Sequence, residues 1–62
     1  MEFRDKLKKR RTEAGLTQVQ LAQKVGVTAR TIQNYELGER VPSNLGVAQK
    51  LADTLGTTLE YL

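Results

Sequence analysis

Three polar side chains, Arg30, Gln33 and Asn34, gather on one side of a short helical stretch of this sequence. On a helical wheel, Arg30 and Asn34 point the same way with Gln33 beside them, while Ile32 and Tyr35 point away. Guanidinium and carboxamide groups are planar and carry several hydrogen-bonding atoms, so they can form paired hydrogen bonds with the edge of a nucleic-acid base. The chemistry that these residues suggest is therefore recognition of base edges.

The composition offers little for catalysis or for metal binding. The 62 residues contain no Cys and no His, which removes thiolate and imidazole ligands and the commonest general base. Neither a nucleophile–base pair nor a cluster of carboxylates is visible. We therefore expect no enzyme activity, no metal and no cofactor. No apolar run approaches the roughly 18 residues of a membrane span, and the charged N-terminus argues against a signal peptide.

Positive charge is concentrated in the first part of the chain. The net charge is +3, but residues 1–40 hold nine Lys and Arg against five Asp and Glu, and six of the cations lie within residues 4–11. A basic N-terminal part indicates an anionic partner, with nucleic acid as the first candidate. The alternative interpretation is an ordinary solvated helix face.

The periodicity of apolar residues predicts an all-α chain, because β-branched alternation is missing throughout. Thr17 and Gln20 form the pattern of a capping box, Thr28 is a second N-cap candidate, and Ser43 a third. A stripe from Leu45 to Leu55 is expected to face the core. The expected helices span about residues 2–14, 17–25, 28–37 and 43–55, with a short fifth helix from 57.

The connection between the second and third expected helices is very short, since it takes up only Val25, Gly26 and Val27, the first of which is also the last residue of the second helix. So short a connection makes the helices cross at a large angle, as in a helix-turn-helix. Gly26 permits the positive φ that the turn requires, and Ala22 permits close approach of the helices. We therefore expect a helix-turn-helix at about residues 17–37.

This stretch resembles the lambda-repressor-like family of helix-turn-helix DNA-binding domains, which includes Cro, phage repressors and xenobiotic-response-element proteins. The resemblance rests on Gln18–Thr28 (QVQLAQKVGVT) with Ile32, Tyr35 and Glu36, and it extends from about Arg4 to Leu62. It implies a compact five-helix bundle and a single domain over residues 1–62.

The resemblance also implies how DNA is bound. The helix at Thr28–Leu37 would lie in the major groove, with Arg30 suited to guanine and Gln33 or Asn34 to adenine. Arg11 and Glu36 match a partly buried ion pair of the family, which gives them a structural role. The implied DNA-binding residues are Thr17, Gln18, Thr28, Ala29, Arg30, Gln33, Asn34, Arg40, Ser43 and Asn44.

The partners implied by the resemblance are double-stranded DNA, with a palindromic operator, and a second copy of the chain. Tyr61 is a candidate dimer contact, whereas Leu59 and Leu62 are expected to pack beneath the first and fourth helices. We expect a transcriptional repressor, encoded by a bacterium or phage and located in the cytoplasm with the nucleoid. No membrane and no small-molecule ligand are expected.

A different class of function is the main alternative, namely a protein-interaction module of the same fold, such as an antitoxin or a coactivator-like bridging protein. Protein-binding faces usually carry an exposed apolar or aromatic anchor. The polar set of Arg30, Gln33 and Asn34 favours DNA, and Leu37 is the only candidate anchor on that helix.

Overall fold

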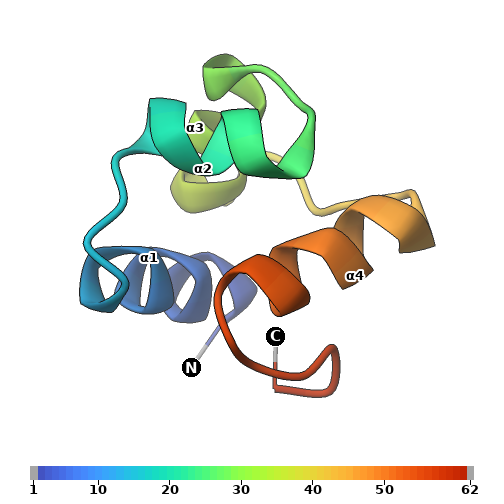
Figure 1. Ribbon diagram of the computed structural model, residues 1–62. Helices are drawn as coiled ribbons and strands as arrows, with labels where there is room; N and C mark the ends of the chain where they lie inside the picture. Colours follow the sequence, from blue (N-terminus) through green and yellow to red (C-terminus); the bar gives the residue numbers. More distant parts are fainter. Residues whose placement is uncertain (1, 62) are drawn as a thin grey trace.

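The computed structural model describes residues 2–61, and these form an all-α structure with four helices (Figure 1). The helices are α1 (Phe3–Glu13), α2 (Gln18–Val25), α3 (Ala29–Leu37) and α4 (Leu45–Thr54). The predicted all-α class and the first four helices are confirmed. No helix among these residues is long and apolar enough to cross a membrane.

The starts of α2 and α3 follow from their threonine caps. Thr17 Oγ1 accepts a hydrogen bond from the Gln20 amide at 3.1 Å, and Gln20 Oε1 accepts one from the Thr17 amide at 2.9 Å. This is the predicted capping box, in which each residue satisfies an amide that the helix cannot. Thr28 caps α3 by accepting from the Thr31 amide at 3.2 Å.

The start of α4 differs from the sequence-based expectation. The N-cap is Asn44 and not Ser43, because Asn44 Oδ1 accepts from the amides of Gly46 at 2.7 Å and Val47 at 3.4 Å. The helix therefore begins at Leu45. The sequence pattern predicts Leu45 on the inward stripe, but its side chain is 71% exposed, since the first turn of α4 projects beyond the core.

The core lies where α3 packs on α1 and α2, and where α2 packs on α4. Its centre consists of the fully buried Leu7, Leu21, Ile32 and Leu51. Around them, the ring of Phe3 meets that of Tyr35 edge to face at 6.0 Å between centroids. Burying these apolar side chains is the main stabilising contribution for so short a chain.

The predicted fifth helix is not formed within residues 2–61, and with it the predicted five-helix count is wrong for this part of the chain. Residues 59–61 instead form a turn, in which the Tyr61 amide donates to the Thr58 carbonyl at 3.1 Å. So short a segment cannot repay the cost of helix nucleation. Leu59 is 36% exposed at this turn, and Leu62 lies outside the described residues.

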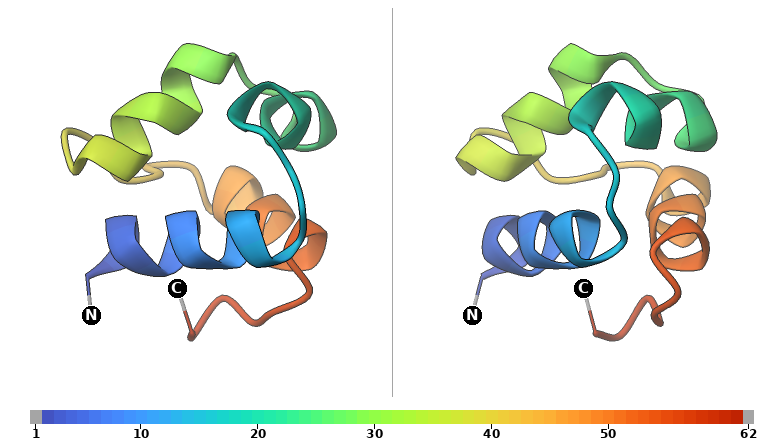
Figure 2. Two further views of the ribbon diagram at one scale, coloured as in Figure 1. Left: turned by 90° about the vertical axis from the view of Figure 1, so that its left-hand side faces the viewer. Right: turned by 60° about the vertical axis from the view of Figure 1, so that its left-hand side comes forward.

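Tyr61 attaches this C-terminal turn to α1. Its ring lies beneath two cations one helical turn apart, with Lys6 Nζ at 5.3 Å and Arg10 Cζ at 4.7 Å from the ring centroid. Both distances are within the range of cation–π attraction. Figure 2 shows the C-terminal segment on the side of α1 that is opposite α3.

Candidate nucleic-acid interface

The outer face of α3 is polar and accessible. Arg30 and Gln33 are exposed, and Asn34 is half-buried, whereas Ile32 and Tyr35 on the inner face are buried. Within residues 2–61, no hydrogen bond or ion pair holds the side chains of Arg30 and Gln33. Figure 2 shows α3 at the edge of the molecule, so a partner can approach along its length.

The turn between α2 and α3 positions that face. Gly26 has φ of 87° and ends α2, and the amides of Gly26 and Val27 both donate to the Ala22 carbonyl, at 2.8 and 3.0 Å. A left-handed residue of this kind is a common way to end a helix abruptly. Ala22 is only 2% exposed and belongs to the buried core cluster. The helix-turn-helix geometry thus follows from residues identified in the sequence.

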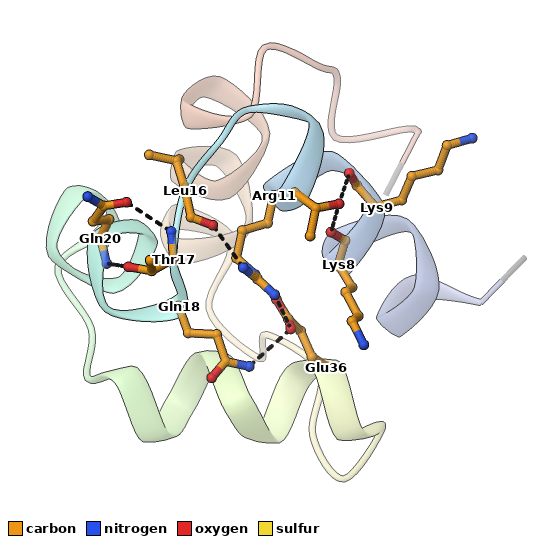
Figure 3. Close-up of polar contacts among 9 residues, drawn as sticks. Lys8, Lys9, Arg11, Leu16, Thr17, Gln18, Gln20 and Glu36 are labelled. Atoms are coloured by element: carbon orange, nitrogen blue, oxygen red, sulfur yellow. Dashed lines mark hydrogen bonds and ion pairs between the residues drawn. The ribbon is translucent and has the colours of Figure 1, made fainter.

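Arg11 and Glu36 form a two-pronged ion pair between α1 and α3 (Figure 3). Arg11 Nε lies 2.6 Å from Glu36 Oε2, and Arg11 Nη2 lies 3.1 Å from Oε1. The third donor, Nη1, binds the Leu16 carbonyl at 2.8 Å. The two side chains are 12% and 5% exposed. The guanidinium therefore fixes α3 relative to α1 and to the loop that leads into α2.

Gln18 joins the same network, which the sequence did not indicate. Its Nε2 donates to Glu36 Oε1 at 3.1 Å, so the carboxylate of α3 holds the first side chain of α2 (Figure 3). No local pattern links residues 18 positions apart on two helices; only the crossing of α2 and α3 brings them together. The contact holds Gln18 at the positive end of the α2 dipole, where an anion is favoured.

The other predicted DNA-binding residues lie around α3. Thr17 and Thr28 are exposed, but their hydroxyls already cap helices, and Ala29 is half-buried against the core. Arg40 follows the end of α3, where its amide donates to the Asn34 carbonyl at 3.4 Å. Arg40, Ser43 and Asn44 are exposed in the connection to α4.

The cations of α1 do not form one free basic face. Arg11 is in the ion pair, and Lys6 and Arg10 cover Tyr61. Arg4 lies at the end of α3, where its Cδ is 2.9 Å from the position that a Cβ on Gly38 would take. Lys8 and Lys9 extend away from the Arg11–Glu36 ion pair, as Figure 3 shows. Lys6, Arg10 and Arg11 thus take part in contacts that hold the fold together, whereas Arg4, Lys8 and Lys9 are exposed.

Comparison with known proteins gives a family match. The family model described as "Helix-turn-helix" matches residues 7–62. An HTH-type transcriptional regulator of Methanothermobacter thermautotrophicus is 45% identical over 54 residues, which cover 87% of this chain and 77% of that protein. The prophage-derived HTH-type transcriptional regulator YonR of Bacillus subtilis is 35% identical over 60 residues, 97% of this chain. The chain spans 55% of the length of YonR.

Solved structures share the fold. A complex of the SinR and SinI proteins aligns with a TM-score of 0.87 at 20% identity, over 97% of this chain and 58% of that one. Hydroxypropylphosphonic acid epoxidase from S. wedmorenis aligns with a TM-score of 0.84 at 31% identity, over 94% of this chain but 30% of the epoxidase. Given the match over residues 7–62, the tight α2–α3 turn and the Arg11–Glu36 pair, the chain belongs to the lambda-repressor-like helix-turn-helix family.

Proposed function

We propose that residues 1–62 are a single helix-turn-helix domain that binds double-stranded DNA sequence-specifically and regulates transcription, as a repressor. The observation that carries this proposal is the polar, unoccupied outer face of α3, held in place through Glu36 by Arg11. The two relatives named HTH-type transcriptional regulators support the same function. For a regulator of this kind we also propose a bacterial or phage origin and a cytoplasmic, nucleoid-associated location.

In the proposed complex, α3 lies in the major groove. Arg30 donates two hydrogen bonds to guanine O6 and N7, and Gln33 or Asn34 pairs with adenine N6 and N7. Ala29 and Thr28, at the start of α3, lie near base edges, where the methyl group of Ala29 suits a thymine methyl.

Phosphate contacts then fix the register of the protein on the duplex. We assign them to Thr17 and Gln18 at the start of α2, and to Arg40, Ser43 and Asn44 between α3 and α4. The amides in the first turn of α2 add a partial positive charge to the first of these contacts.

We propose that two copies bind a palindromic operator. One copy presents one recognition helix and few phosphate contacts, whereas two copies about one DNA turn apart double both.

Selection of bound DNA from a random oligonucleotide pool, at low and moderate salt, tests the proposal. We expect a palindrome whose half-sites lie about one turn apart. Recovery of DNA without a consensus would contradict sequence-specific reading, and no recovery at either salt would contradict DNA binding.

A protein-interaction module is the second candidate, because the similar SinR structure was solved as a complex with another protein. Leu37 on α3 is 56% exposed and would be the anchor. The polar side chains around it favour DNA. We propose no catalytic activity: the aligned part of the epoxidase is less than a third of that enzyme, and no cluster of metal-ligating side chains occurs in residues 2–61.

A further inference from the structure

The side chain of Arg4, in the first turn of α1, lies across the end of α3. Gly38 is the C-cap of α3, and the position that a Cβ on Gly38 would take is 2.9 Å from both Cδ and Nη1 of Arg4. Any side chain at residue 38 would therefore push the Arg4 side chain aside, whereas glycine lets it lie directly on the backbone. Figure 2 shows the N-terminal turn of α1 beside the C-terminal end of α3 in both views.

This packing positions the guanidinium of Arg4 but does not use its hydrogen-bonding groups. Arg4 is exposed, and within residues 2–61 its side chain forms neither an ion pair nor a hydrogen bond. The guanidinium of Arg11, by contrast, is engaged by Glu36 and by the Leu16 carbonyl. An arginine side chain that is already positioned loses less conformational freedom when it binds an anion.

The end of α3 would by itself repel an anion. The last carbonyl groups of a helix carry partial negative charge, and α3 has no basic residue in its own last turn. Glu39 follows Gly38 directly and adds a full negative charge. Arg4 brings a positive charge to this place from another helix, and Arg40 adds a second at the start of the connection to α4. With both arginines present, the charged side chains at this end sum to +1.

In the proposed complex, the C-terminal end of α3 faces a phosphate backbone. A recognition helix contacts base edges chiefly with residues near its N-terminus, which directs its C-terminal end toward the edge of the groove. The nine residues of α3 span about 13 Å, close to the roughly 12 Å width of the major groove. A cation that lies over Gly38 is therefore on the side of α3 where phosphates pass.

We propose that Arg4 binds a DNA phosphate at the C-terminal end of the recognition helix, and that Gly38 leaves the space in which its guanidinium lies. The inference rests on the proposed DNA-binding function and adds to it a contact from α1. The planar guanidinium can donate two parallel hydrogen bonds to phosphate oxygens. Phosphates are alike in every sequence, so the contact strengthens binding to all duplexes and reads no base.

Arg4→Gln tests the phosphate contact, since it removes the charge and keeps an exposed polar side chain. Each phosphate contact contributes about 0.9 to the slope of log affinity against log salt concentration. The slope of the variant should be smaller by about this amount for each bound copy, with equal loss of affinity on selected and random duplexes. For each bound copy, the loss should shrink about eightfold with each tenfold rise in salt. Fluorescence anisotropy across a salt series measures both quantities.

Lys9→Gln is the matched control for this charge removal. Lys9 is also an exposed cation of α1, but it extends away from the ion pair that joins α1 to α3 (Figure 3). The control should keep the wild-type salt slope. The slope also separates binding from stability, because an Arg4 that only stabilises the end of α3 would lower the midpoint of thermal unfolding and leave the salt slope of the folded variant unchanged.

Gly38→Ala tests the space that the guanidinium occupies. The added Cβ displaces Arg4, so the variant should bind DNA more weakly, by up to the loss seen for Arg4→Gln. In the Arg4→Gln background it should cause no further loss, since no guanidinium is left to displace. Gly56→Ala is the control for backbone strain, because Gly56 has a φ of 65°, against 81° at Gly38, but a Cβ there meets no atom within 4 Å. It should leave the affinity unchanged, and circular dichroism establishes that each variant is folded.

The outcomes separate this proposal from the proposed function. Wild-type protein that binds no selected DNA contradicts the function itself. Wild-type protein that binds selected DNA, while Arg4→Gln keeps the wild-type salt slope, overturns the Arg4 contact alone. An equal change of slope with Lys9→Gln also overturns it, as does a loss that is confined to the selected duplex. If the loss caused by Gly38→Ala is the same with and without Arg4, the role of Gly38 is wrong.

Discussion

At the scale of single residues, the polar side chains of the chain divide into those that are occupied and those that are free. Arg11, Glu36 and Gln18 bind one another, whereas Arg30 and Gln33 have no partner within residues 2–61. The hydrogen-bonding groups of Arg30 and Gln33 are available to a binding partner, whereas those of Arg11, Glu36 and Gln18 are already used within the fold. The two groups therefore predict different consequences of mutation.

Arg30→Ala should reduce affinity for the selected site while leaving binding to random DNA nearly unchanged. A bidentate arginine–guanine contact contributes roughly 1–3 kcal/mol of discrimination, which corresponds to about 5- to 150-fold in affinity. Competition binding with specific and random duplexes measures this ratio. Equal losses on both duplexes would show that Arg30 contacts phosphate and does not read a base.

Glu36→Gln should destabilise the fold, because it leaves the nearly buried Arg11 guanidinium without a countercharge. Breaking such a pair costs about 3 kcal/mol, a large part of the stability of a domain this small. Urea unfolding followed by circular dichroism provides the measurement. Asp53→Asn is the matched control, since it also removes one carboxylate but from an exposed contact with Gln49. If both variants unfold at the same urea concentration, the ion pair has no structural importance.

At the scale of elements, the turn between α2 and α3 determines how the outer face of α3 is oriented relative to α2. Gly26 has a φ of 87°, and a Cβ added there would meet no atom within 4 Å. Steric contact with neighbouring atoms therefore does not exclude a larger residue at position 26, and only the positive φ does. A substitution at Gly26 therefore tests the backbone conformation without disturbing the packing of the core.

Gly26→Ala should cost about 1–2 kcal/mol, since an L-residue with a Cβ is strained in the left-handed region. Gly26→Asn should cost less, because asparagine tolerates this conformation better. Thermal unfolding of the two variants gives the comparison. Equal destabilisation by Ala and Asn would mean that packing, not φ, restricts the position.

At the scale of the whole molecule, the charge distribution is less one-sided than the sequence indicated. Lys6, Arg10 and Arg11 of α1 are engaged by Tyr61 and Glu36. Of these three, only Arg11 is paired with a countercharge, because the ring of Tyr61 is uncharged, and we expect the direct phosphate contacts to come from the cations and helix ends around α3.

Affinity for the palindrome should therefore fall steeply with salt. If two copies neutralise roughly 6–10 phosphates, affinity decreases by about 10³–10⁵ between 50 and 200 mM salt. Arg40→Gln should make the slope shallower, and Lys9→Gln should leave it unchanged. Fluorescence anisotropy across a salt series measures both slopes. A flat response of the wild type would contradict phosphate binding, and a larger effect of Lys9 would place the contacts on α1.

Features that depend on neighbouring residues could be predicted from the sequence alone. The capping box of Thr17 and Gln20, the turn at Gly26 and the periodicity of α1 to α3 are local, because hydrogen bonds and side-chain spacing within one turn decide them. For the same reason, helical periodicity is sufficient to assign the inner face of α3 to the core and its outer face to solvent.

Contacts between residues that are far apart in the sequence depend on the tertiary structure. The bond from Gln18 to Glu36 requires the crossing of α2 and α3, and the choice of Asn44 over Ser43 as cap depends on the path of the chain after α3. The C-terminal turn is the clearest case. A segment too short to form a helix takes its shape from the surface it meets, which here is the pair of cations that covers Tyr61.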